Sequence, residues 1–136
     1  EIKPVEGTPL DFTEPTPIGA GINADHPAIE VGRGYDINFV LDHPAGEMGL
    51  AARVVEPQTG RVMEVYTDQP GVHLYTGNFL DGSIMGKSGK KYVKRGAFCL
   101  ETQHYPDSVH HPNFPDTILR PGETYETETV FAFSTK

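Results

Sequence analysis

The residue best placed for chemistry is a glutamate, Glu101, which interrupts an apolar run at residues 98–103. Alternation along a strand puts Glu101 on the same face as Cys99 and Gln103. If Cys99 faces the interior, the carboxylate of Glu101 is either buried or opens into a pocket. Proteins seldom bury a carboxylate unless it is paired or functional, because removing its charge from water is costly. An ordinary solvent-facing strand glutamate explains the same pattern, so both interpretations stay open at this stage.

Two further polar side chains lie among apolar and aromatic neighbours. Asp36 follows an aromatic residue in the run 34–39, and His73 lies in the apolar run 71–75. A polar acceptor beside aromatic rings suits the hydroxyls and the C–H faces of a sugar. Taken alone, each residue is equally well explained as a side chain whose hydrogen bonds are satisfied within a sheet.

A third group of polar residues crowds into the eight positions 104–111, namely His104, Asp107, His110 and His111. Imidazole and carboxylate groups can ligate a metal ion, but this spacing matches no closed metal signature. The chain also lacks a phosphate-binding glycine loop, a cysteine pair at zinc spacing and a serine nucleophile elbow. We therefore expect no metal site here.

Charge and cysteine content narrow the possible partners and setting. The chain carries 19 acidic against 11 basic residues, a formal net charge of −8, so no basic patch predicts nucleic-acid binding. No apolar run approaches membrane-spanning length, so we expect no membrane partner. The single cysteine, Cys99, cannot form an internal disulfide, which favours a reducing, cytoplasmic setting.

The elements that position these residues are predicted to be short strands and loops, because 15 Gly and 12 Pro punctuate the 136 residues. Residues 56–61 have the chemistry of a tight hairpin, with Pro early and Gly late. Residues 104–120 contain too many prolines for a helix. We expect strands or strand-like runs at 29–41, 48–56, 61–67, 72–79 and 97–103, a surface loop at 81–91, and loop structure at 1–27 with a short extended piece at 8–12.

The C-terminal tail alternates cleanly from residue 125 to 133, with aromatic and threonine side chains on one face. No helical period persists over ten residues. These patterns together predict an all-β fold, an antiparallel β-sandwich, and the 136 residues fit within one domain.

Several of these segments resemble, in the same order, the C-terminal portion of the aldose 1-epimerase (galactose mutarotase) family. Residues 70–82, Pro-Gly-Val-His-Leu-Tyr-Thr-Gly-Asn-Phe-Leu-Asp-Gly, are similar to its stretch PGVQ, an apolar residue, YTGN and FLDG. Residues 98–107 are similar to its FCLETQ stretch followed by Pro-Asp. Further similarity lies at residues 8–12, 34–41, 112–115 and 119–125. The resemblance thus covers nearly the whole chain.

This resemblance implies a large β-sandwich enzyme of carbohydrate metabolism that interconverts the α and β anomers of free aldoses, typically galactose and glucose, without a cofactor. In the family a general base takes the proton of the C1 hydroxyl while a general acid protonates the ring oxygen. The motif match puts the base at Glu101 and a sugar-binding carboxylate at Asp36. His73 stands where many members have a Gln that touches the sugar, and its imidazole can still donate one hydrogen bond there. Ile37 stands where many members have His, and we expect it to tune the surroundings of Asp36 without abolishing its role.

The family's histidine general acid lies N-terminal to the first matching segment, and none of the six histidines here occupies its motif. The chain begins at Glu1 without an initiator Met, which predicts a processed, excised or truncated chain. Two accounts follow. Either the N-terminal part of the same enzyme supplies the acid, for example as a separate chain, or this chain is a non-catalytic carbohydrate-binding or self-associating β module. An unrelated metal-binding β protein is a more distant alternative.

Overall fold

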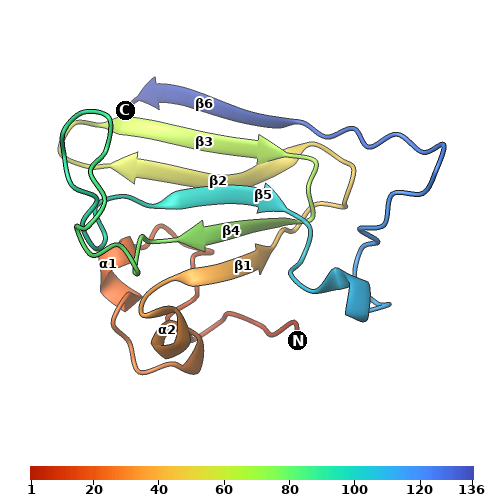
Figure 1. Cartoon of the computed structure of the whole chain (residues 1–136), viewed down its shortest axis with the longest axis horizontal. Helices are drawn as coiled ribbons and strands as arrows, with labels where there is room; N and C mark the ends of the chain where they lie inside the picture. Colours follow the sequence, from red (N-terminus) through yellow and green to blue (C-terminus); the bar gives the residue numbers. More distant parts are fainter. The chain divides into compact units, whose positions relative to one another are not determined.

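Nearly all regular structure in the chain is β-strand, as predicted (Figure 1). The structure is a computed structural model that describes all 136 residues. Its strands are β1 (Asp36–Val40), β2 (Gly49–Glu56), β3 (Arg61–Thr67), β4 (Gly71–Tyr75), β5 (Cys99–Gln103) and β6 (Thr129–Thr135). The helical elements are short: α1 (Ile18–Gly21), α2 (Pro27–Gly32) and the 3-10 turn η1 (Ser108–His110). None of the helices has the length and apolar character needed to cross a lipid bilayer.

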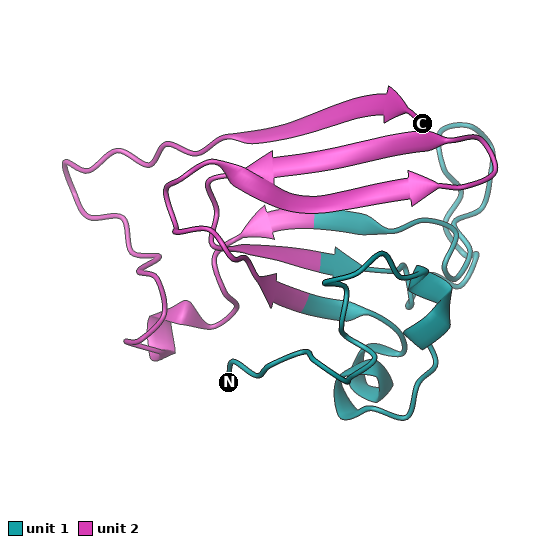
Figure 2. Cartoon of the chain, turned by 180° about the vertical axis from the view of Figure 1, so that it is seen from behind, with its two compact units in different colours: residues 1–37, 74–100 teal, residues 38–73, 101–136 magenta.

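The chain divides into two compact units, which Figure 2 distinguishes by colour. Unit 1 comprises residues 1–37 and 74–100, and unit 2 comprises residues 38–73 and 101–136. One three-stranded sheet, of order β2-β3-β6, lies entirely in unit 2. The other has the order β1-β4-β5, and each of its strands has residues in both units.

The β2–β3 hairpin of unit 2 forms where the turn chemistry predicts it. The two strands pair antiparallel from Gly49 opposite Thr67 to Glu56 opposite Arg61. The carboxylate of Glu56 closes the turn by accepting hydrogen bonds from the backbone N–H of Gln58 and Thr59, 3.0 and 2.7 Å away, and from the Thr59 hydroxyl. The hydroxyl bond is the main reason that the pKa of Glu56 is lowered.

Strand β6 completes this sheet as an edge strand and is shorter than predicted. It pairs antiparallel with β3, with Phe131 opposite the fully buried Val65. Residues 125–128 leave the strand because the Thr127 hydroxyl and the Glu128 N–H bind the Asp68 carboxylate instead, at 2.5 and 3.1 Å. The aromatic rings of β6 stay open to solvent, with Phe131 47% and Phe133 74% exposed.

The prediction of a strand from residue 29 is wrong, because α2 occupies residues 27–32 and β1 begins only at Asp36. His26 caps the helix by accepting a hydrogen bond from the Ala28 N–H, 3.3 Å from its Nδ1, and Pro27 takes the first helical position, where its missing N–H is not needed. Arg33 ends the helix in a left-handed conformation (φ 54°). Capping chemistry thus outweighs the apolar residues of a segment too short to show a helical period.

Three smaller predictions also need correction. The expected extended piece at residues 8–12 is a turn, in which the Thr8 hydroxyl donates to the Val5 carbonyl and accepts from the Leu10 N–H. The proline-rich stretch 104–120 does contain one helical turn, η1. Strand β4 ends at Tyr75 rather than residue 79, because Thr76 and Asn78 turn their side chains to the backbone of Tyr35.

These last contacts form a buried polar cluster in unit 1. The Tyr35 N–H donates to the Thr76 hydroxyl (3.1 Å), which donates to the Asn78 side-chain oxygen (2.7 Å), and the Asn78 amide donates to the Tyr35 carbonyl (2.7 Å). Gly34 lies at φ 141°, and a Cβ at this position would overlap the Asn78 amide. The cluster therefore locks the start of β1 to the end of β4 and requires glycine at position 34.

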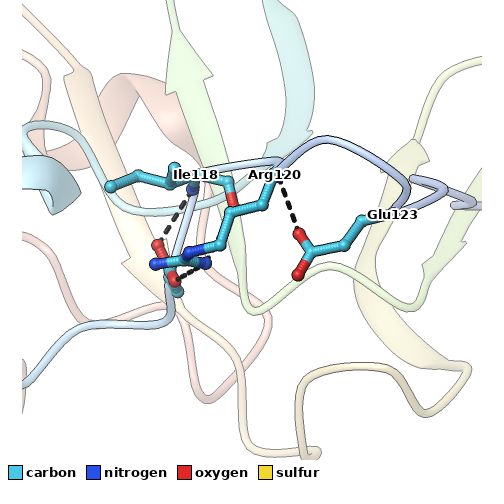
Figure 3. Close-up of polar contacts among 4 residues, drawn as sticks. Ile118, Arg120 and Glu123 are labelled. Atoms are coloured by element: carbon cyan, nitrogen blue, oxygen red, sulfur yellow. Dashed lines mark hydrogen bonds and ion pairs between the residues drawn. The ribbon is translucent and has the colours of Figure 1, made fainter.

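The segment between η1 and β6 has no regular structure but is held by its own polar contacts (Figure 3). The Asp116 carboxylate accepts hydrogen bonds from the Ile118 N–H (2.9 Å) and the Arg120 guanidinium (3.0 Å). The Glu123 carboxylate accepts from the Arg120 N–H (2.8 Å). The pKa of Asp116 is lowered, first by the Ile118 N–H and then by Arg120. The Leu-Arg-Pro-Gly-Glu motif at 119–123 thus stabilises a local turn.

Candidate active site

Glu101 lies on β5 with its side chain exposed. On this strand Cys99 and Glu101 are exposed, whereas Leu100 and Thr102 are partly covered. The Thr102 hydroxyl lies 2.6 Å from the Thr129 hydroxyl of β6, so this face of β5 is turned toward the β2-β3-β6 sheet. Alternation puts Glu101 on the opposite face. Because Cys99 does not face the interior, the condition under which Glu101 would be buried is not met in this chain.

His73 occupies the middle strand of the β1-β4-β5 sheet. Its neighbours Val72 and Leu74 are buried, at 4% and 5% exposure, while His73 itself is half-buried. The imidazole therefore lies on the face of β4 opposite the apolar side chains.

Asp36 begins β1 and is exposed. The Thr76 N–H donates to the Tyr35 carbonyl at 3.1 Å, so Asp36 lies opposite Tyr75 in the sheet and the two side chains share a face. The end of α2 packs against it, since a Cβ on Gly32 would lie only 2.9 Å from the Asp36 Cβ. Glycine at the end of α2 thus leaves room for the Asp36 side chain.

The three predicted site residues therefore fall on three adjacent strands of one sheet, Asp36 on β1, His73 on β4 and Glu101 on β5. His73 and Glu101 belong to unit 2, and Asp36 belongs to unit 1. An exposed carboxylate and a half-buried imidazole are groups that can accept and donate protons or bind hydroxyls. Their specific roles remain predictions.

Sequence reasoning missed a stack of side chains in unit 1 beside Asp36. The rings of Tyr75 and Phe79 are nearly parallel (13°) with centroids 6.5 Å apart, and the Arg33 guanidinium lies 5.5 Å from the Phe79 centroid. The Phe79 N–H also donates to the Tyr75 hydroxyl at 3.2 Å. We call these three residues the Arg33 stack. No local pattern predicts it, because its members come from the end of α2 and the exit of β4.

A second missed feature is a hydrogen-bonded network around Gln69 in unit 2, which we call the Gln69 network. Gln69 is 5% exposed, and its amide donates to the Tyr125 and Thr127 hydroxyls at 2.9 and 2.6 Å. Its side-chain oxygen lies 2.8 Å from Nδ1 of His104, which must therefore carry the proton. The Thr127 hydroxyl in turn donates to Asp68 and is the main cause of that residue's lowered pKa.

Two hollows accompany these features. One of about 250 Å³ in unit 2 is lined by residues of the Gln69 network together with Gly46, Pro70 and Glu126. One of about 360 Å³ in unit 1 is mainly apolar and is lined by Ile18, Ile22 and Phe98 among others. Neither is lined by Glu101, Asp36 or His73.

The histidine-rich loop separates into two parts. His104 binds Gln69, whereas His110 and His111 both contact the Asp107 carboxylate, His111 at 3.4 Å. The His110 hydrogen bond is the main reason that the pKa of Asp107 is lowered. No three His, Cys, Asp or Glu side chains of the chain are arranged to hold a metal ion.

Comparison with known proteins identifies the protein family to which this chain belongs. The sequence profile of the aldose 1-epimerase family matches residues 1–132, and the chain belongs to that family. It is similar to the galactose mutarotase of Rattus norvegicus (49% identity over 98% of this chain) and to that of Homo sapiens (48% over 98%). It is also 34% identical, over 97% of its length, to the aldose 1-epimerase of Escherichia coli strain K12.

The likeness extends to three dimensions. A crystal structure of an aldose epimerase homologue from C. elegans matches 96% of this chain with a TM-score of 0.77 at 28% identity. The chain spans 37% of the length of the rat and human relatives, and 38% of the C. elegans chain. The predicted all-β fold and the resemblance to the family are therefore confirmed.

Proposed function

We propose that the protein containing this chain is an aldose 1-epimerase, a mutarotase that interconverts the α and β anomers of free aldoses such as galactose and glucose. In this proposal the chain is the C-terminal part of the family's β-sandwich and supplies the general base, Glu101. The observation that carries it is the match of residues 98–107 to the family's motif, with Glu101 exposed on a strand of a sheet that also holds Asp36 and His73.

The chemistry needs a proton acceptor and a proton donor with different resting states. The carboxylate of Glu101 is exposed and takes the proton of the C1 hydroxyl in this proposal. A general acid gives a proton to the ring oxygen, the C1–O5 bond breaks, and the ring opens to the free aldehyde. Rotation about C1–C2 and closure on the other face of the carbonyl then yield the other anomer.

The remaining predicted residues bind the sugar. Asp36 accepts hydrogen bonds from sugar hydroxyls, and a charged acceptor makes these bonds short and strong. The half-buried imidazole of His73 contributes one further hydrogen bond. The general acid, a histidine, comes from the N-terminal part of the enzyme, in the same polypeptide or as a separate chain.

The exposed, unpaired thiol of Cys99 supports a reducing, cytoplasmic setting.

Polarimetry of freshly dissolved α-galactose tests the proposal. Glu101→Gln keeps the size of the side chain but removes the base, and the enzymatic rate should fall by about 10²–10⁴-fold. Glu47→Gln is the matched control, since Glu47 is an exposed loop residue of the same unit, and its rate should equal that of the parent protein. Retention of the full rate by Glu101→Gln would show that another group is the base.

One observation favours a second candidate, a carbohydrate-binding or self-associating β module without catalysis. The edge strand β6 presents Phe131 and Phe133, 47% and 74% exposed, together with its free backbone edge. Such an edge can pair with another chain. Calorimetric binding of galactose without any acceleration of mutarotation, combined with concentration-dependent association in sedimentation, would favour this candidate. Intact-mass analysis of the purified protein shows whether a second polypeptide accompanies the chain.

A further inference from the structure

The Arg33 stack connects the predicted sugar-binding carboxylate to a cation through two aromatic rings. Arg33 precedes Asp36 by three residues, and the neighbouring Gly32 packs directly on the Asp36 Cβ. Tyr75 lies opposite Asp36 in the sheet and stacks on Phe79, which carries the guanidinium of Arg33. One continuous patch of unit 1 therefore joins a carboxylate, two aromatic rings and a guanidinium.

The backbone of Arg33 is fixed in this position. Arg33 ends α2 in the left-handed region (φ 54°), and its carbonyl accepts a hydrogen bond from the Arg95 guanidinium at 3.0 Å. Arg95 is held in turn by its own N–H, which donates to the Gly77 carbonyl at 3.0 Å. The loop from α2 to β1 is thus tied to the segment that follows β4. Because the backbone is already anchored, ligand binding by Arg33 has to order only the side chain.

The stacked geometry determines how Arg33 can bind. Phe79 is 54% exposed, and the guanidinium carbon of Arg33 lies over its ring, 5.5 Å from the centroid. The N–H donors of a guanidinium lie in its plane, so stacking leaves their directions unchanged, and two parallel donors match the two oxygens of a carboxylate or phosphate. Two adjacent sugar hydroxyls can accept the same pair of donors, but a carboxylate or phosphate adds the attraction of opposite charge, which makes the bonds stronger.

The negative net charge of the chain affects how an anionic sugar could bind near Arg33. The formal net charge is −8, and the nearby Asp36 adds a negative charge, so the surroundings repel an anionic sugar unless a specific cation receives it. A positively charged side chain kept over an aromatic ring beside Asp36 supplies such a receptor.

We propose that Arg33 is a specificity-determining residue that binds an anionic substituent, carboxylate or phosphate, of an aldose whose hydroxyls are held by Asp36. This inference rests on the proposed mutarotase function and names a substrate class for it: sugar acids or sugar phosphates in addition to neutral aldoses. Phe79 acts as a positioning residue, since it holds the guanidinium without touching the sugar's charge.

The test compares kcat/KM for a neutral aldose, galactose, with that for two anionic ones, galacturonic acid and galactose 6-phosphate, by magnetisation-transfer NMR between the anomers. Hydrogen bonds to charged groups are strong enough that Arg33→Gln should lower the ratio of anionic to neutral kcat/KM by about 10–100-fold, mostly through KM. Arg33→Lys keeps the charge but loses the paired donors, and should lower the ratio by a smaller factor. Arg53→Gln, at an exposed position of β2, should leave the ratio unchanged.

The two anionic sugars distinguish a carboxylate from a phosphate as the preferred group. The inference is overturned if Arg33→Gln leaves the ratio of anionic to neutral kcat/KM unchanged, for instance by lowering both values equally. If the protein does not accelerate mutarotation of galactose at all, the proposed function fails instead. The role of Arg33 is then judged by calorimetry, where the affinity ratio of galacturonic acid to galactose must still fall in Arg33→Gln.

Discussion

Replacing Gln69 by Leu tests whether the Gln69 network stabilises unit 2. Gln69 is 5% exposed and makes three side-chain hydrogen bonds, to Tyr125, Thr127 and His104. Leucine has a similar volume but forms none of them. The loss of three net bonds of about 1 kcal/mol each sets an upper value near 3 kcal/mol. Because Tyr125 and Thr127 are exposed and can bind water instead, we expect a loss of about 2 kcal/mol in the free energy of unfolding.

Differential scanning calorimetry measures this loss as a change in Tm. At about 2–4 °C per kcal/mol, Gln69→Leu should lower Tm by about 4–8 °C. Gln58→Leu makes the same chemical change at an exposed position in the β2–β3 turn and should leave Tm within about 1 °C. A Tm for Gln69→Leu equal to that of the Gln58→Leu control would refute the reasoning that the buried amide is a stabilising centre.

Two further perturbations address other parts of the chain. The pKa of Asp68 is lowered, chiefly by the Thr127 hydroxyl, so the contribution of Asp68 to folding stability is present above the ordinary aspartate pKa of about 4 and is lost as pH falls below it. Asp68→Asn should therefore flatten the decline of the urea midpoint between pH 5 and pH 3. An unchanged decline would contradict this. Gly34→Ala places a Cβ at φ 141°, where it overlaps the Asn78 side chain, and should lower the free energy of unfolding in urea by at least about 2 kcal/mol. Gly19→Ala has open space around its Cβ and should not destabilise the protein. Similar midpoints for the two variants would contradict the steric argument.

Features encoded by a few consecutive residues were predictable from the sequence. The β2–β3 hairpin follows from Pro57 and Gly60 between two β-branched runs, and the structure confirms its register from Glu56 to Arg61. The helix α2 escaped prediction although its signals, a capping His26 and Pro27, were present, because six residues are too few to display a helical period. Local turn chemistry is therefore a more dependable guide in this chain than apolar patterning over short segments.

The residues of the candidate site could be predicted from the sequence, but the residues that surround them in the fold could not. The motif at residues 98–107 points to Glu101, yet which face of β5 is covered depends on Thr102 meeting Thr129, a residue distant in sequence. The Arg33 stack and the Gln69 network likewise join segments that are far apart along the chain. No local periodicity encodes such pairings, so only the folded structure reveals them.

The buried cluster of Tyr35, Thr76 and Asn78 bears on which neighbouring positions of this chain can be varied. The cluster adds interior side-chain hydrogen bonds to the backbone pairing of β1 with β4, and Arg33 and Phe79 contribute no side-chain bond to it. Side-chain variation at positions 33 and 79 therefore leaves these hydrogen bonds in place, although the left-handed φ of 54° at Arg33 disfavours β-branched residues there. Under the proposed role of Arg33, a library randomised at those two codons should contain folded variants whose preference for anionic over neutral sugars differs from that of the parent protein.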